Sequence, residues 1–160
     1  MRIEVTERTT IARPAWEVRD QFRDVTYHAG NAVHRRHRVA VLERRGGRIR
    51  YALTVAAGFR SVRLEVVMIE SVHGALVNEV IDGRLEGSIV TYEFEWVGPS
   101  DTTVVATASV ELTRAMGALA PLVRRWLRRT LRESLEEDRD DLESERYASA
   151  GRRYAHPSVA

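Results

Sequence analysis

The sequence predicts an α+β domain in which a curved antiparallel sheet of about seven strands surrounds a long C-terminal helix, with two short helices after the first strand. Seven short segments up to residue 112 read as strands, and in most of them apolar and polar residues alternate with a period of two. Beyond about Ala115 the apolar residues recur every three or four positions, which is the period of a helix. The sheet must bury its apolar face, and the terminal helix is its only large amphipathic partner.

The first strand and the two short helices belong to the N-terminal part of the chain. Residues 3–11 alternate as a strand does and are rich in threonine. Pro14 then stands at a suitable first position for a helix, followed by apolar residues at helical spacing. A second helical stretch is predicted from Thr26 to His34, interrupted at Gly30.

Six further strands follow, separated by turn residues such as Gly46-Gly47. They are predicted at residues 38–44, 49–55, 62–68, 76–81, 89–97 and 104–112. Their regular alternation predicts one solvated face and one buried face.

The C-terminal helix is predicted from an apolar stripe at three- and four-residue spacing. The stripe consists of Leu119, Leu122, Val123, Trp126, Leu127, Thr130, Leu131, Leu135 and Leu142. Residues 133–146 are dense in charge and should form its solvated distal part. Gly151 is expected to end the helix, so we predict one domain over residues 1–150 and a flexible tail over 151–160.

Composition excludes several classes of protein. The 160 residues include 44% hydrophobic and 30% charged residues, which is ordinary for a globular domain. The absence of cysteine excludes disulfides, thiolate metal sites and an iron–sulfur cluster within the chain. All 25 basic residues are arginine, but acidic residues are interleaved and the net charge is only +2, so no nucleic-acid partner is expected. Neither a signal peptide nor a membrane span is evident, and a cytoplasmic protein is expected.

Three features together carry a resemblance to a known family. A first strand runs into a short helix at Thr9–Val18, a strand runs into a glycine turn at Val41–Gly47, and an amphipathic helix ends the order of elements. In this order the chain resembles the helix-grip proteins, also called the START or SRPBCC superfamily, which includes the polyketide aromatase/cyclases. The resemblance implies a cavity between the sheet and the long helix that binds a bulky, hydrophobic, polyketide- or lipid-like molecule.

In such a fold the buried sheet face is also the wall of the cavity. Its aromatic residues suit a planar ligand, and tyrosine hydroxyls can fix the orientation of that ligand. The predicted ligand-binding residues are Tyr51, Leu53, Leu64, Met68, Tyr92, Phe94, Trp96 and Trp126. Arg60 and Glu79 are candidate catalytic residues, because a charge that points inward from a strand needs a partner or a ligand; the alternative is that both face water.

A second resemblance concerns the segment Asp20–His34, which is similar to the iron-binding segment of Rieske-type ring-hydroxylating oxygenases. Glu136-Glu137-Asp138-Arg139 is similar to the context of the third iron ligand in that family. This resemblance implies that His28, His34 and Asp138 bind a divalent metal such as iron, a ligand set that suits non-haem iron(II). Asp24 would orient a histidine from the outer shell, and His37 is an alternative to His34.

The two histidines can bind the same metal only if the helix between them is interrupted. Side chains six residues apart on an unbroken helix point about 120° away from each other. Gly30 must therefore break the helix if His28 and His34 are to share one metal. Because the chain lacks cysteine, electrons for an oxygenase reaction would have to come from a separate electron-transfer protein.

Three functional hypotheses remain at the level of the sequence. The first is a protein that binds a small hydrophobic molecule, with cyclase or dehydratase chemistry by acid–base groups. The second is a metal-dependent enzyme that uses His28, His34 and Asp138, for which the alternative is three polar residues at a pocket mouth without metal. The third is a non-catalytic carrier or partner-binding module, which could form a homodimer through the sheet face or the arginine-rich helix.

Overall fold

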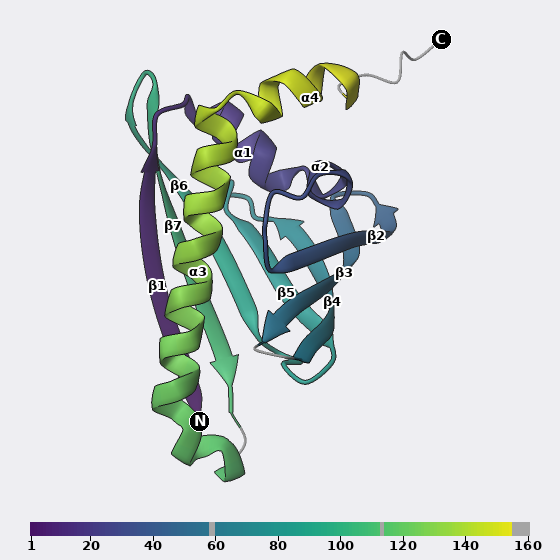
Figure 1. The fold of residues 1–160 in the computed structure, drawn as a ribbon, viewed down its shortest axis with the longest axis vertical. Coiled ribbons are helices and arrows are strands. Elements are labelled where there is room, and N and C mark those ends of the chain that lie inside the picture. Colours follow the sequence, from purple (N-terminus) through teal and green to yellow (C-terminus); the bar gives the residue numbers. More distant parts are fainter. Residues whose placement is uncertain (58–59, 113, 155–160) are drawn as a thin grey trace.

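A strongly curved antiparallel sheet wraps around one long helix in the computed structural model, which describes residues 1–57, 60–112 and 114–154 (Figure 1). The strands are β1 (Arg2–Ile11), β2 (His37–Arg45), β3 (Arg48–Ala57), β4 (Arg60–Glu70), β5 (Leu76–Asp82), β6 (Ile89–Gly98) and β7 (Asp101–Glu111). The helices are α1 (Ala15–Arg23), α2 (Val25–Gly30), the short 3-10 helix η1 (Arg114–Leu119), α3 (Ala120–Glu143) and α4 (Arg146–Tyr154). The fold class predicted from the sequence is confirmed, and each strand lies within three residues of its predicted bounds.

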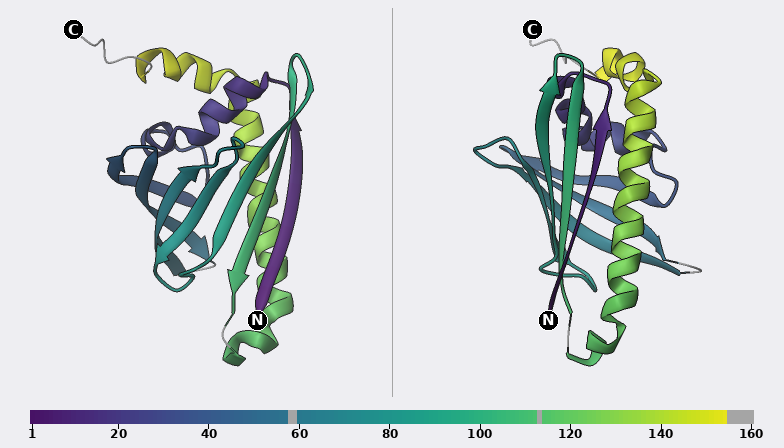
Figure 2. Two further views of the ribbon diagram at one scale, coloured as in Figure 1. Left: turned by 180° about the vertical axis from the view of Figure 1, so that it is seen from behind. Right: turned by 90° about the vertical axis from the view of Figure 1, so that its left-hand side faces the viewer.

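The seven strands follow the order β1-β7-β6-β5-β4-β3-β2 with every neighbouring pair antiparallel. Strands β2 to β7 are joined as successive hairpins, whereas β1 pairs with β7 from the opposite end of the chain. Register shifts interrupt the β2–β3, β4–β5 and β6–β7 pairings, and bulges of this kind bend a sheet and increase its twist. As a result β2–β4 incline away from β1, β6 and β7 and enclose the space beside α3 (Figure 2).

The main core lies where α3 packs on β1 and β7. Leu127, Leu131 and Leu135 stand four residues apart, so they share one face of the helix, and all three are buried. On the sheet side their partners are small or β-branched, which allows the helix to approach the strands closely. These partners include Ile3, Val5, Val104, Ala106, Ala108 and Val110. No helix within the described ranges is both long enough and apolar enough to cross a membrane.

The two short helices begin in different ways. Pro14 precedes α1 as its N-cap residue and is not its first helical residue. The Asp24 carboxylate caps α2 by accepting a hydrogen bond of 2.9 Å from the Tyr27 N–H. The helix ends at Gly30, and extended backbone begins at Asn31. The predicted helical stretch to His34 is therefore shorter than expected, and it breaks at the glycine that the sequence singled out.

The end of the chain differs from the prediction. α3 ends at Glu143, and Glu145 adopts a positive φ of 60°, so the chain turns and forms α4 across the end of α2. Tyr147 of α4 packs edge-on against Tyr27 at 4.8 Å between ring centroids, which gives the turn a packing reason. Gly151, the predicted helix end, lies inside α4. Of the predicted tail 151–160, residues 155–160 lie outside the described residues.

Candidate functional site

A cavity of about 190 Å³ lies between the concave sheet face, the α1–α2 segment and α3. Its wall is mainly apolar. The lining side chains include Phe22, Val25, Val39, Tyr51, Leu53, Val55, Leu64, Val66, Met68, Val80, Leu85, Val90, Tyr92, Trp126, Leu127 and Leu131. Polar side chains interrupt this wall at three places: beside α2, where histidines and Asp138 meet, on α3 at Thr130 and Ser134, and on the sheet.

Most of the residues predicted to contact a ligand line this cavity. They are Tyr51, Leu53, Leu64, Met68, Tyr92 and Trp126. Phe94 and Trp96 do not. Phe94 instead packs edge-on against Phe22, with the ring centroids 5.6 Å apart. Trp96 is 70% exposed, because β6 continues beyond the part of the sheet that the helices cover (Figure 2). Alternation correctly groups these aromatic residues on one face but does not indicate where that cover ends.

Arg60 and Glu79, the candidate catalytic residues, both have exposed side chains. Neither is among the residues that line the cavity. The structure therefore does not bring them to the same site as the histidines.

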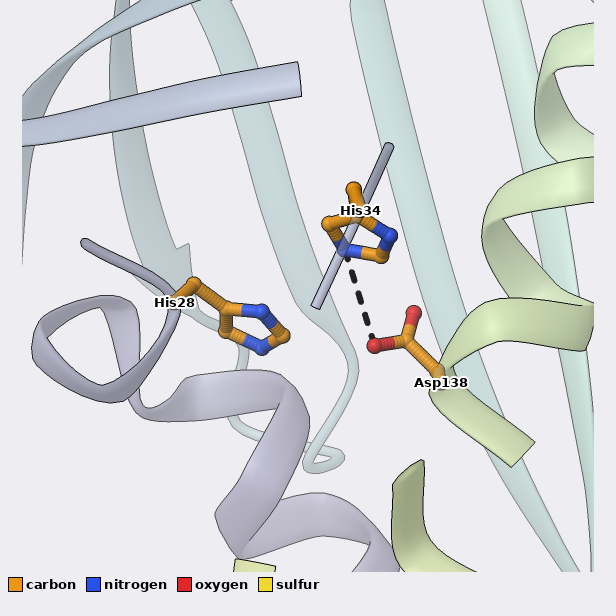
Figure 3. Close-up of side chains that lie close together, drawn as sticks. All are labelled: His28, His34 and Asp138. Carbon is orange, nitrogen blue, oxygen red and sulfur yellow. Dashed lines mark ion pairs between the residues drawn. The ribbon is translucent and has the colours of Figure 1, made fainter. Parts of the chain in front are cut away.

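The metal-ligand candidates converge at the α2 end of the cavity. His28 comes from α2, His34 from the extended segment after it, and Asp138 from α3 (Figure 3). One ligand atom from each of the three lies within 4.8 Å of the other two. The break at Gly30 makes this possible, because it brings the two imidazole rings into a parallel stack with centroids 5.3 Å apart.

The hydrogen bonds of both histidines indicate which ring nitrogen donates to the protein and which faces the site. His28 Nε2 lies 3.1 Å from the backbone carbonyl oxygen of Gln21, which can only accept, so Nε2 donates and Nδ1 keeps its lone pair. This Nδ1 atom is buried and has no hydrogen-bond partner within the described part of the chain. His34 Nδ1 donates to Glu137 Oε2 at 3.3 Å, which leaves Nε2 to face Asp138 Oδ1 at 3.6 Å. Metal-binding histidines in proteins are held in this way, with the second nitrogen donating to a carbonyl or carboxylate.

The electrostatics of the site favour positive charge at His34. Burial lowers the pKa of His28, with Asp138 acting in the opposite direction. Burial also opposes protonation of His34, but the carboxylates of Asp138 and Glu137 outweigh it and raise the pKa of His34. A metal cation at this position would face the same two carboxylates. His37 lies beside His34 with ring centroids 5.2 Å apart, and burial lowers the pKa of His37 to about 4.

A buried hydrogen-bond network holds the Asp138 carboxylate in place. Gln21 Nε2 donates to Asp138 Oδ1 at 3.0 Å and to Asp141 Oδ2 at 3.3 Å. The Tyr27 hydroxyl donates to both carboxylate oxygens of Asp141 at 2.9 Å. Desolvation and the neighbouring Asp141 carboxylate raise the pKa of Tyr27, so its hydroxyl remains a donor. Arg146 approaches Asp141 from the surface, at 3.4 Å between Nε and Oδ1.

Sequence reasoning missed Gln21, Glu137 and Asp141 as parts of this site. It also assigned the outer-shell role to Asp24, which caps α2 instead; Glu137 and the Gln21 carbonyl orient the histidines. One signal was available, because Asp138 and Asp141 continue the buried face of the terminal helix after Leu135. A carboxylate on such a face needs an internal partner.

Comparison with known proteins supports the fold. No family model and no curated protein matches the chain. A protein from Thermus thermophilus is similar in structure, with a TM-score of 0.80 and 20% sequence identity over 89% of this chain and 98% of that chain. So is the Zhui aromatase/cyclase from Streptomyces sp. R1128, with a TM-score of 0.72 and 17% identity over 92% and 96%. A START superfamily protein from Mycobacterium smegmatis has a TM-score of 0.75 and 14% identity over 88% and 97%. The chain thus has the helix-grip fold.

Proposed function

We propose that this protein binds a small, largely apolar aromatic molecule in the cavity between the sheet and α3. The observation that carries the proposal is the cavity itself, whose wall is apolar and includes the aromatic rings of Tyr51, Tyr92 and Trp126. Pockets of this composition, with a few polar groups, are typical sites for small molecules. The similarity in fold to an aromatase/cyclase supports the same ligand class and suggests cyclisation or dehydration as the reaction class. The imidazoles at the α2 end are the groups available for proton transfer.

Filling the cavity should weaken binding. Val90 lines the cavity from β6, and a Val90→Phe substitution is expected to weaken binding of N-phenyl-1-naphthylamine, a neutral aromatic dye, by about tenfold or more because the ring occupies the ligand's space. Val97→Phe is the matched control, since Val97 lies on the same strand but is 59% exposed. Dye fluorescence titrations measure both affinities, and circular dichroism checks the fold. Unchanged affinity in a folded Val90→Phe protein would contradict the proposal. If an aromatic molecule that binds in the cavity is recovered chemically unchanged after incubation with the protein, a carrier is favoured over an enzyme.

A second proposal is that His28, His34 and Asp138 bind one divalent metal ion. It is favoured by the convergence of three ligand atoms: the ring nitrogens His28 Nδ1 and His34 Nε2, which do not donate to Gln21 or Glu137, and the Asp138 carboxylate. Two histidines and one carboxylate form the ligand set of mononuclear non-haem iron(II) sites and leave positions open for substrate. A bound metal would supply Lewis-acid or redox chemistry at the α2 end of the cavity. An oxygenase reaction would also require an electron donor beyond these 160 residues, which contain no cysteine for a cluster.

Metal binding can be tested on untagged protein purified without chelator. We expect about one equivalent of Co²⁺ to bind with visible absorption bands, competed by Fe²⁺ under anaerobic conditions. His28→Ala or Asp138→Asn should weaken Co²⁺ binding by more than about 100-fold, which exceeds the loss typical of an outer-shell partner. His73→Ala is the control, because His73 is an exposed turn residue. Wild-type protein that binds no Co²⁺, or a His28→Ala variant with unchanged affinity, would refute the metal site.

A further inference from the structure

On the sheet the cavity has a polar group that the proposed metal site does not use. It consists of Tyr51 on β3, Asn78 on β5 and Ser88 just before β6, and all three line the cavity. Asn78 stands opposite Val90 in the β5–β6 pairing, and Val80 donates its backbone N–H to the Ser88 carbonyl at 2.9 Å. Asn78 and Ser88 are therefore diagonal neighbours across two adjacent strands.

The hydrogen bonds of this group are incomplete. The Tyr51 hydroxyl donates to Asn78 Oδ1 at 3.0 Å. Whichever way the Asn78 amide is oriented, one of its polar atoms pairs with Tyr51 and the other remains available. Ser88 is only 3% exposed, and its hydroxyl oxygen has no hydrogen-bond partner among the residues described. Leaving a buried hydroxyl unpaired is costly, so such a group calls for a partner that the described residues do not provide.

The charge of the surroundings limits what that partner can be. Asn78 and Ser88 are uncharged, and burial raises the pKa of Tyr51, so its phenol stays neutral. The described side chains that line the cavity include no arginine, Asp138 is their only carboxylate, and their histidines belong to the α2 end and not to the sheet. An anionic group at the sheet would therefore be desolvated without a cation beside it, whereas a neutral hydroxyl or carbonyl oxygen would meet both donors and acceptors.

We propose that Asn78 and Ser88 form a subsite for a neutral oxygen atom on the ligand, with Tyr51 holding the Asn78 amide in place. The ligand class that follows is phenols and aromatic ketones, in preference to hydrocarbons and carboxylic acids. This inference rests on the proposed binding of an aromatic molecule in the same cavity, and it adds which functional group the cavity selects.

A series of bicyclic aromatics with one variable group tests the subsite. Binding of naphthalene, 2-naphthol and 2-naphthoate to chelator-treated protein is measured by intrinsic fluorescence and calorimetry, so that metal plays no part. We expect 2-naphthol to bind about tenfold more tightly than naphthalene or 2-naphthoate. Ser88→Ala should remove most of that preference and leave the affinity for naphthalene unchanged. Ser61→Ala, at an exposed position on β4, is the matched control and should keep it.

The outcomes separate this inference from the proposed function. If naphthalene binds but 2-naphthol binds no more tightly, or if Ser88→Ala keeps the preference, the subsite is refuted and ligand binding stands. If none of the three compounds binds to folded wild-type protein, both proposals are overturned. Asn78→Leu provides a second variant in case Ser88→Ala does not fold, and its loss of preference for 2-naphthol supports the subsite in the same way.

Discussion

Replacing Gln21 with leucine is expected to lower the free energy of unfolding by about 3–5 kcal/mol, because it leaves two buried carboxylates without a shared donor. Gln21 is fully buried, and its amide nitrogen donates to both Asp138 and Asp141. These carboxylates are only 4% and 2% exposed, so water cannot readily replace the lost donor. Chemical denaturation followed by circular dichroism measures the change.

A double-mutant cycle distinguishes the electrostatic cause from a packing defect. In an Asp138→Asn/Asp141→Asn background no carboxylate remains at these positions, so Gln21→Leu should cost much less there than in the wild type. An equal cost in both backgrounds would mean that the leucine simply fits badly. The cycle thus tests whether the amide is present to hold the two carboxylates of the site.

Replacing Leu135 with alanine should destabilise the protein by about 2–5 kcal/mol, the range for removing a large buried side chain from a rigid core. Leu135 is 1% exposed and lies on the α3 face that packs against β1 and β7. Leu122→Ala on the same helix is the matched control; Leu122 is 66% exposed, and its truncation should change stability by less than about 0.5 kcal/mol. Urea denaturation of both variants provides the comparison. Equal losses for the two would contradict the assigned packing face of α3.

The fold was predictable because two local periods determine which face of each element is buried. Alternation in β6 and β7 and the four-residue spacing from Leu127 to Leu135 need no long-range information. The end of α3 was not predictable in this way. Residues 144–146 are compatible with a continued helix, and the turn at Glu145 follows from the tertiary contact between Tyr147 and Tyr27. Such contacts override local propensity.

The candidate site was predictable only in part. The approach of His28, His34 and Asp138 followed from a family resemblance together with the expected break at Gly30. The support that Gln21 gives to Asp138 could not be inferred, because it joins residues 117 positions apart. The polar subsite was missed for a different reason. The sequence pattern around Asn78 and Ser88 does not reveal that the Ser88 hydroxyl is buried without a hydrogen-bond partner among the described residues.

The pairing of β1 with β7 has a consequence for how the cavity comes into being. Arg2 on β1 bonds the Ser109 hydroxyl across 107 positions of sequence, whereas each of the hairpins from β2 to β7 closes over a short loop. Joining such distant segments costs more loop-closure entropy than forming a hairpin does, and such long-range contacts are characteristic of slow folding. During synthesis the nascent chain can pair β2 with β3 early, but β1 has no partner until β7 has emerged from the ribosome. The cavity can therefore form only after β7 and α3 have been translated. A ligand that bound in it would stabilise the folded protein by mass action.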